Sequence, residues 1–215
     1  MKALGALAAL LLLGAAAPPT IGPSFSCKGA LSPSEAAICG DPELAAWDRA
    51  VARIYRASIK TTDIDPSDQR QWLSRRDECR ADQACLLRVY REWPGFDVAA
   101  TGIGRVYERT GTGRRDPASL EIMPIHGDWY YFSLIALHQQ TDDPASTNTG
   151  VYSGVVRLMS GIGTYDEGSE EYSCRFQLER ERSGWSISTF GQTPKCGGLN
   201  VFVDGNYRPV RRVQR

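Results

Sequence analysis

The sequence is poor in the side chains on which most enzymes and metal sites depend. It has two histidines, His126 and His138, and it contains no His-Glu-x-x-His motif, no Gly-x-Ser-x-Gly motif and no phosphate-binding glycine loop. A surplus of charge is also missing, because 25 basic and 25 acidic residues give a formal net charge of zero. This balance argues against nucleic acid or an anionic membrane as a partner, and no cofactor is expected.

A long apolar run occurs only at the start of the chain. Met1-Lys2 is a short basic start, Ala3 to Leu13 is apolar, and Gly14 to Ala17 supplies small residues for cleavage. This pattern predicts a secretory signal peptide over residues 1–17, since the run is shorter than the roughly 20 residues of a membrane span. We therefore expect a periplasmic or secreted protein with no membrane association after the signal is removed.

All six cysteines lie after this segment, and no Cys-x-x-Cys spacing is present. Structural zinc ligands are usually separated by about two to four residues, so no metal is expected. An even number of cysteines in an oxidising compartment favours disulfides. Cys174 and Cys196 lie alone in the second half and are expected to pair with each other.

Residues 24–95 have the periodicity of helices. Ser32-Pro33, Asp41-Pro42 and Asp65-Pro66 each combine a capping side chain with a proline suited to the first helical turn. Apolar side chains then recur three and four positions apart, as in Leu44, Trp47, Val51 and Ile54. We expect three to four helices in a small antiparallel hairpin, and so thin a core usually needs disulfides.

Two pairings of the four cysteines in this half remain open. If helices over residues 41–60 and 66–79 form a hairpin, the start of the first lies near the end of the second, which favours Cys39 with Cys79 and leaves Cys27 for Cys85. The alternative is two local bridges, one from Cys27 to Cys39 and one from Cys79 to Cys85.

The pattern changes between residues 100 and 210, where short segments rich in β-branched and aromatic residues alternate with Gly, Pro, Asp and Ser. Arg182-Ser183-Gly184 is a predicted hairpin turn. Helices followed by strands predict an α+β protein whose second half is an antiparallel β-barrel or sandwich. The predicted strands are Gly102–Arg109, Leu120–Ile125, Trp129–His138, Val151–Met159, Tyr172–Glu179, Trp185–Phe190 and Asn200–Tyr207.

The helical half resembles a known family. The residues that carry the resemblance are Cys27, Pro33, Glu35, Ile38-Cys39, Asp41 to Leu44, Asp48, Tyr55, Gln71 to Leu73, Arg76-Asp77, Cys79, Cys85-Leu86 and Tyr90. Together they are similar to the LprI-like lysozyme-inhibitor N-terminal domain family over about residues 24–93. The resemblance implies a disulfide-stapled helical fold and, as an activity, inhibition of lysozyme. The β half resembles an uncharacterised secreted module that often follows such domains.

A further resemblance lies in the β half. Ser160-Gly161-Ile162-Gly163-Thr164-Tyr165 is similar to the Ser-Gly loop of MliC-type inhibitors of C-type lysozyme, in which a loop serine meets the catalytic acids of the enzyme. The alternative is that the glycines form a turn between strands. We take Ser160 and Tyr165 as candidate partner contacts. The acidic residues beside them would suit a basic partner such as lysozyme, and they are Asp166, Glu167, Glu170 and Glu171.

One pair of residues suggests catalysis. His126 would be a general base oriented by Asp128, although a histidine at a strand-to-turn corner is the plainer interpretation. We expect a binding protein without catalytic activity, and our leading hypothesis is that it occludes the cleft of lysozyme or another peptidoglycan-acting enzyme. The alternatives are an envelope structural or stress-response interaction protein that does not inhibit lysozyme, and a hydrolase that uses His126 and Asp128.

Overall fold

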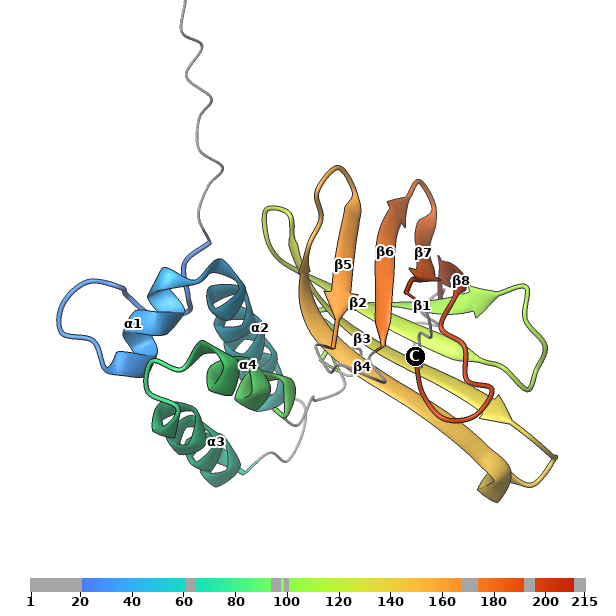
Figure 1. Ribbon diagram of the computed structural model, residues 1–215, viewed down its shortest axis with the longest axis horizontal. Coiled ribbons are helices and arrows are strands. Elements are labelled where there is room, and N and C mark those ends of the chain that lie inside the picture. Colours follow the sequence, from blue (N-terminus) through green and yellow to red (C-terminus); the bar gives the residue numbers. More distant parts are fainter. Residues whose placement is uncertain are drawn as a thin grey trace, which may run out of the picture.

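The computed structural model describes residues 21–60, 65–93, 98, 101–167, 174–191 and 196–210, so the signal peptide predicted over residues 1–17 lies outside the described part. Within these ranges the chain forms four α-helices followed by eight antiparallel strands. This confirms the α+β order expected from the sequence. Figure 1 shows the helices gathered on one side of the molecule and the strands on the other.

Each helix begins at a side chain that caps its first free N–H groups. Ser32 and Glu35 form a capping box, in which each side chain accepts the main-chain N–H of the other residue. The carboxylates of Asp41, Asp65 and Asp82 accept N–H groups in the same way at the three other starts. The helices are α1 (Pro33–Gly40), α2 (Pro42–Ser58), α3 (Pro66–Glu78) and α4 (Gln83–Arg91).

The disulfides of the helical half differ from the favoured prediction. Cys27 is bonded to Cys39 and Cys79 to Cys85, with Cα–Cα distances of 5.8 and 5.5 Å. The pairing of Cys39 with Cys79 is therefore wrong, as is that of Cys27 with Cys85, and the local alternative is correct. The predicted bridge between Cys174 and Cys196 in the β half is confirmed.

The direction of α1 explains why Cys39 does not reach α3. The first turn of α1 is the part that meets the end of α3, where the Ser34 hydroxyl donates to the Asp77 carboxylate at 2.9 Å. Cys39 lies about 7 Å farther along this helix, because each residue advances the axis by about 1.5 Å. Beyond α3 the chain turns back at Arg80, which has a φ of 53°, and this reversal places Cys79 beside Cys85.

The strands form one nearly closed barrel. Neighbouring strands pair in the order β4-β3-β2-β1-β8-β7-β6-β5, so β4 and β5 are the two edges, and the bridge between Met159 and Ile162 is the link between them among the described residues. The short 3₁₀ turn η1 (Pro144–Ser146) precedes β4. The strands are β1 (Arg105–Thr110), β2 (Ala118–His126), β3 (Trp129–Gln139), β4 (Thr147–Arg157), β5 (Ile162–Asp166), β6 (Arg175–Glu181), β7 (Gly184–Thr189) and β8 (Gly205–Pro209).

The predicted strands differ from the observed ones at two places. No strand was predicted where β5 lies, because Gly163 interrupts the β-branched pattern and the run is only five residues long. The predicted strand Asn200–Tyr207 is only partly right, because β8 begins at Gly205. The preceding residues serve another purpose, which is to close one end of the barrel.

Segment 196–204 closes that end from inside. The disulfide from Cys174 to Cys196 attaches it to the start of β6, and Val201 and Val203 are buried in the barrel core. Arg109 points inward here, and its guanidinium donates to main-chain carbonyls of this segment and of the β1–β2 loop. Above this closure the interior is filled by buried side chains from alternate strand positions, among them Leu120, Phe132, Leu134, Phe176, Leu178 and Tyr207.

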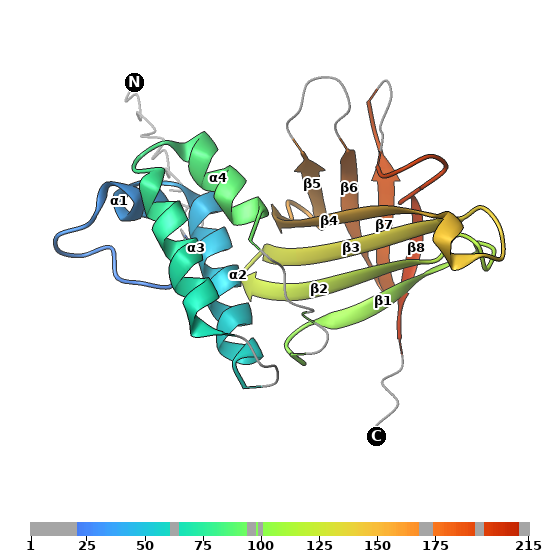
Figure 2. The same cartoon turned by 90° about the horizontal axis from the view of Figure 1, so that it is seen from below.

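The helices pack on the outer face of the barrel. Trp47 of α2 meets Tyr131 of β3 edge-to-face, with ring centroids 6.1 Å apart. Met123, Trp129 and Val155 from the outer faces of β2, β3 and β4 belong to the same buried cluster as the helical core. Figure 2 shows α2 lying against the ends of these strands. The helices therefore share one hydrophobic cluster with the outer face of the sheet, while the barrel interior forms a second cluster of its own. The division at residues 95–100 stays a prediction.

Candidate binding site at the open end of the barrel

Three turns surround the end of the barrel opposite the closing segment. They join β2 to β3 at Gly127-Asp128, β4 to β5 at Ser160-Gly161, and β6 to β7 at Arg182-Ser183. The predicted turn after β6 is confirmed. Because consecutive strands run in opposite directions, alternate connections of the meander come together at this end. In Figure 1 the β4–β5 and β6–β7 turns project beyond the sheet.

The β4–β5 turn is tight and held on both sides. Ser160 and Gly161 have φ values of 53° and 91°, which is the left-handed pair of a two-residue hairpin. Met159 and Ile162 exchange main-chain hydrogen bonds of 2.8 and 3.1 Å across it. On the β6 side, the Arg180 N–H donates to the Gly161 carbonyl at 2.8 Å. The interpretation of these residues as a turn between strands is confirmed.

The tip of this hairpin, residues 159–162, presents apolar side chains to solvent. Met159 is 62% exposed and Ile162 is 39% exposed, and Ser160, between them in the sequence, is exposed as well. A hollow of about 470 Å³ lies beside the tip and reaches the first turn of α2, where burial raises the pKa of Glu43. The surface here thus combines a rigid projection with an adjoining recess.

Tyr165 does not lie on a loop. It is an inward residue of β5 that is 8% exposed, and its ring packs against Phe132 and Phe176 with centroids 5.2 and 4.9 Å away. Burial raises the pKa of its phenol to about 12. Tyr165 therefore belongs to the barrel core, and its prediction as a surface contact conflicts with this position.

The predicted acidic contacts are also separated from the turn. Asp166 is the last residue of β5 and Glu167 follows it, so the two lie roughly 13 and 17 Å along the strand from Ile162 at about 3.3 Å per residue. Asp166 is paired with Arg175 at 3.0 Å, and the Glu167 carboxylate accepts the N–H of Cys174 at 3.3 Å. The structure therefore does not bring the predicted contacts together on one loop.

Two further residues of that acidic segment, Glu170 and Glu171, lie outside the described residues. Their predicted contact with a partner stays a prediction.

The His126–Asp128 pair lacks the geometry of a base and its orienting acid. The Asp128 carboxylate accepts a hydrogen bond from the Nε of Arg157 at 2.8 Å, in an ion pair that joins the β2–β3 turn to β4. His126 is exposed, and its imidazole shows no hydrogen bond to another residue in the described part of the chain. The structure therefore shows Asp128 paired with Arg157 and not with His126, and the hydrolase alternative stays a prediction. His138 lies at the closed end, where its Nδ1 is 2.7 Å from an Asp116 carboxylate oxygen.

Sequence reasoning missed a second feature of this end, a cavity of about 550 Å³ inside the barrel mouth. Its walls include Tyr107, Tyr130 and Trp185, with Arg105 and Arg180 near the rim. The alternation of side chains along a strand could have revealed this cavity. Arg105 lies on the same inward face of β1 as Tyr107, and Arg180 lies on the same inward face of β6 as the core residues of that strand. An arginine at an inward position of a predicted barrel strand would therefore have indicated a polar opening at this end.

The described ranges contain no group of three or more His, Cys, Asp or Glu side chains arranged to hold a metal ion. They also contain no helix that has the length and apolar character to cross a membrane.

No family model, curated protein or solved structure matches this chain. The resemblance of residues 24–93 to the LprI-like family thus stays a prediction, and the function has to be inferred from the residues themselves.

Proposed function

We propose that this chain is a secreted or periplasmic binding protein without turnover of its own, and that it inhibits lysozyme or another peptidoglycan-cleaving enzyme by inserting the β4–β5 tip into the enzyme's cleft. The exposed, doubly anchored tip is the observation that carries the proposal. A projection that is already rigid loses little conformational entropy when it binds, which favours cleft insertion over a mobile loop.

The chemistry of the tip suits such a cleft. Met159 and Ile162 supply apolar contact area, and the Ser160 hydroxyl can donate or accept a hydrogen bond at the point of deepest insertion. The recess beside the tip, lined by Trp129, Arg157 and Thr164 among others, offers space for a side chain of the partner. The contact would therefore involve both a projection and a pocket.

The likeness of residues 24–93 to the LprI-like family supports the same function from the other half of the chain. Three disulfides accord with an oxidising compartment outside the cytoplasm, as the predicted signal peptide requires. Because α2 packs on β3 through Trp47 and Tyr131, a surface that combines both halves is stereochemically available.

The test is an inhibition assay on purified, oxidised protein against lysozymes of each class and bacterial peptidoglycan hydrolases. Met159→Asp places a charge at the tip without disturbing any buried group, and it should weaken inhibition about tenfold or more. Leu199→Asp is the matched control, because Leu199 is 73% exposed and lies in the closing segment at the other end of the barrel.

Equal loss of inhibition in both variants would mean that the tip is not the contact. Absence of inhibition by the unmodified protein at micromolar concentration would overturn the inhibitory function. That result would favour the alternative of an envelope interaction protein that does not affect lysozyme.

A further inference from the structure

The cavity in the barrel mouth is a separate feature from the tip. Its lining residues include inward strand positions of β1, β2, β3, β6, β7 and β8, so it is the upper end of the barrel interior and not a groove on the outside. Its volume of about 550 Å³ falls within the range of roughly 300–1,000 Å³ typical of small-molecule sites. Barrel mouths are among the places where such sites recur.

The floor of the cavity is aromatic. The ring of Trp185 meets those of Tyr107 and Tyr130 edge-to-face, with centroids 6.4 and 5.7 Å apart. Trp185 and Ile122 are both only 4% exposed, so the floor is firmly packed. Such a surface offers ring faces and edges to a flat or cyclic ligand.

The depth of the cavity is limited by the filled interior below it. Phe132 and Leu178, one layer farther in, are fully buried, and the other end of the barrel is closed by segment 196–204. Among the described residues, these buried side chains occupy the space beneath the aromatic floor that a long acyl chain would need. The ligand must therefore be a compact molecule that enters from the open end.

The rim of the cavity is basic. Arg105 and Arg180 occupy inward register positions, opposite Ile122 and Trp185 respectively. The Arg180 guanidinium extends from β6 across the mouth to donate to the hydroxyl of Tyr130 on β3 at 3.3 Å. The Arg105 guanidinium shows no hydrogen bond or ion pair to another described residue, although the main chain of Arg105 pairs with β2. Inward positions of a barrel are normally apolar, so two arginines there require an explanation.

Among the described lining residues, no acidic side chain pairs with these two arginines. Glu181 is the acidic residue among the described lining side chains, and it is already paired with Arg208 at 3.0 Å. Arg182 in the β6–β7 turn adds a third positive charge at the rim. Guanidinium groups bind carboxylate, sulfate and phosphate oxygens through paired N–H donors. Because the formal net charge of the whole chain is zero, the positive charge at the mouth reflects the local arrangement of arginines and not a basic composition.

We infer that the barrel mouth binds a small soluble anion with a ring-shaped, largely apolar body. The ring would lie on Tyr107, Tyr130 and Trp185, and the carboxylate, sulfate or phosphate group would be held by Arg105 and Arg180. This site is independent of the tip, since a mouth ligand would bind whether or not the protein inhibits an enzyme.

The test compares two fluorescent probes with the same ring system on the full oxidised protein. 1-Anilinonaphthalene-8-sulfonate carries an anionic group, and N-phenyl-1-naphthylamine is its uncharged counterpart. We expect saturable one-to-one binding of the sulfonate, about tenfold or more tighter than that of the neutral probe. Inorganic sulfate at the same concentration should not displace it, because sulfate has no ring to occupy the floor.

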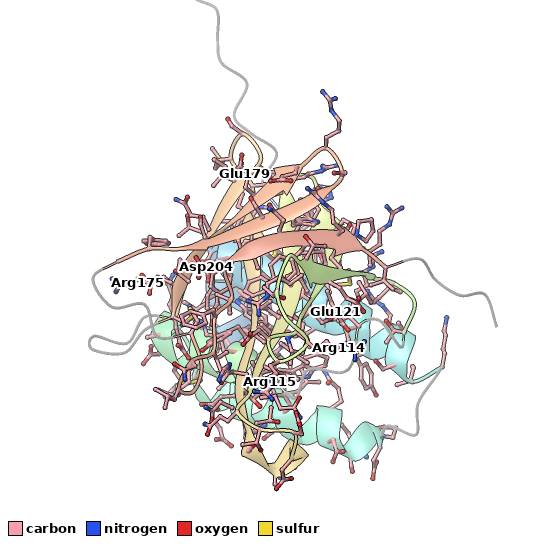
Figure 3. The ribbon with its side chains drawn as sticks, turned by 90° about the vertical axis from the view of Figure 1, so that its right-hand side faces the viewer. Arg114, Arg115, Glu121, Arg175, Glu179 and Asp204 are labelled. Atoms are coloured by element: carbon pink, nitrogen blue, oxygen red, sulfur yellow. A yellow bond between two sulfur atoms is a disulfide. The ribbon has the colours of Figure 1, made fainter. Side chains whose placement is uncertain are left out.

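The double variant Arg105→Gln/Arg180→Gln should remove the preference for the sulfonate and leave binding of the neutral probe. The matched control is Arg114→Gln/Arg115→Gln, which loses the same charge from the β1–β2 loop at the closed end, on the side seen in Figure 3. This control should keep the preference. Thermal unfolding of both variants checks that the fold is retained.

Three results would overturn the inference. They are the lack of saturable sulfonate binding by the folded protein, equal affinity for the two probes, and equal loss of the preference in the rim variant and its control. None of them depends on the inhibition assay with tip variants, so the two proposals can fail separately.

Discussion

Replacement of Asp48 by alanine should be among the most destabilising single changes in the helical half. Asp48 is 5% exposed and lies at the centre of a polar network inside an apolar core. One carboxylate oxygen accepts the Tyr90 hydroxyl at 3.2 Å and lies 3.7 Å from the Arg76 guanidinium, and the other accepts the Ser24 N–H at 2.6 Å. The network holds the chain before α1 and helices α2, α3 and α4 together.

The magnitude follows from what the substitution leaves behind. Arg76 is 8% exposed, and without Asp48 its acidic partner among the described residues is Asp77, whose side chain is half exposed. Removal of one partner of a buried ion pair costs about 3–5 kcal/mol. We expect about 3 kcal/mol for Asp48→Ala, because the bond from Arg76 to Asp77 at 2.7 Å survives. In a chain of this size that corresponds to a fall in Tm of roughly 6–12 °C.

Urea and thermal denaturation followed by circular dichroism measure this cost. Asp48→Asn is the matched control, since it keeps an acceptor but loses the charge, and it should cost about 1–2 kcal/mol. Asp48→Ala/Arg76→Met should recover part of the loss, because no unpaired charge is left in the core. If Asp48→Ala lies within about 0.5 kcal/mol of the unmodified protein, the network does not stabilise the fold and the reasoning is refuted.

Three further predictions concern the disulfides and the tyrosines. Peptide mapping of the unreduced protein should recover the two local helical bridges, and a peptide joining Cys39 to Cys79 would contradict the structure. Serine at both Cys174 and Cys196 opens a bridge with a sequence separation of 22, which should lower the free energy of unfolding in urea by about 3 kcal/mol; an unchanged value would mean that the closing segment does not depend on the bridge. Burial raises the pKa of Tyr165 to about 12, so the unfolded chain loses this proton first, near pH 10, and stability should fall from about pH 10 to about pH 12. Absorbance at 295 nm should then show late phenolate formation together with unfolding, whereas titration of every tyrosine near pH 10 in the folded state would show that the ring is not buried.

The helices were predictable because their signals are local. A capping side chain such as Ser32 or Asp41 acts on N–H groups two or three residues away, so its effect depends little on the rest of the fold. The turn at Arg182-Ser183 was predictable for the same reason. In contrast, β5 was missed because a strand of five residues containing Gly163 is stabilised mainly by its partner β6, which no local pattern reveals.

The candidate site was less predictable than the fold. Ser160-Gly161 was identified as a turn, but sequence proximity placed Tyr165 and Asp166 beside it, and the extended strand carries them into the core and to the far end. The cavity in the mouth is lined by residues of six strands, and Arg105 and Arg180 both line it because the barrel nearly closes. The composition does not indicate this basic cavity, because the formal net charge of the chain is zero.

The sequence by itself determined the class of this protein, the starts of its helices, the strand character of its second half and the pairing of Cys174 with Cys196. These follow from short-range sterics, hydrogen bonding and the periodicity of apolar residues, together with the lack of other cysteines nearby. Only the tertiary structure decided the bridges of the helical half, the docking of α2 on the barrel and the basic, aromatic mouth. Each of these depends on the direction in which elements pack, which is set by contacts between residues far apart in the chain.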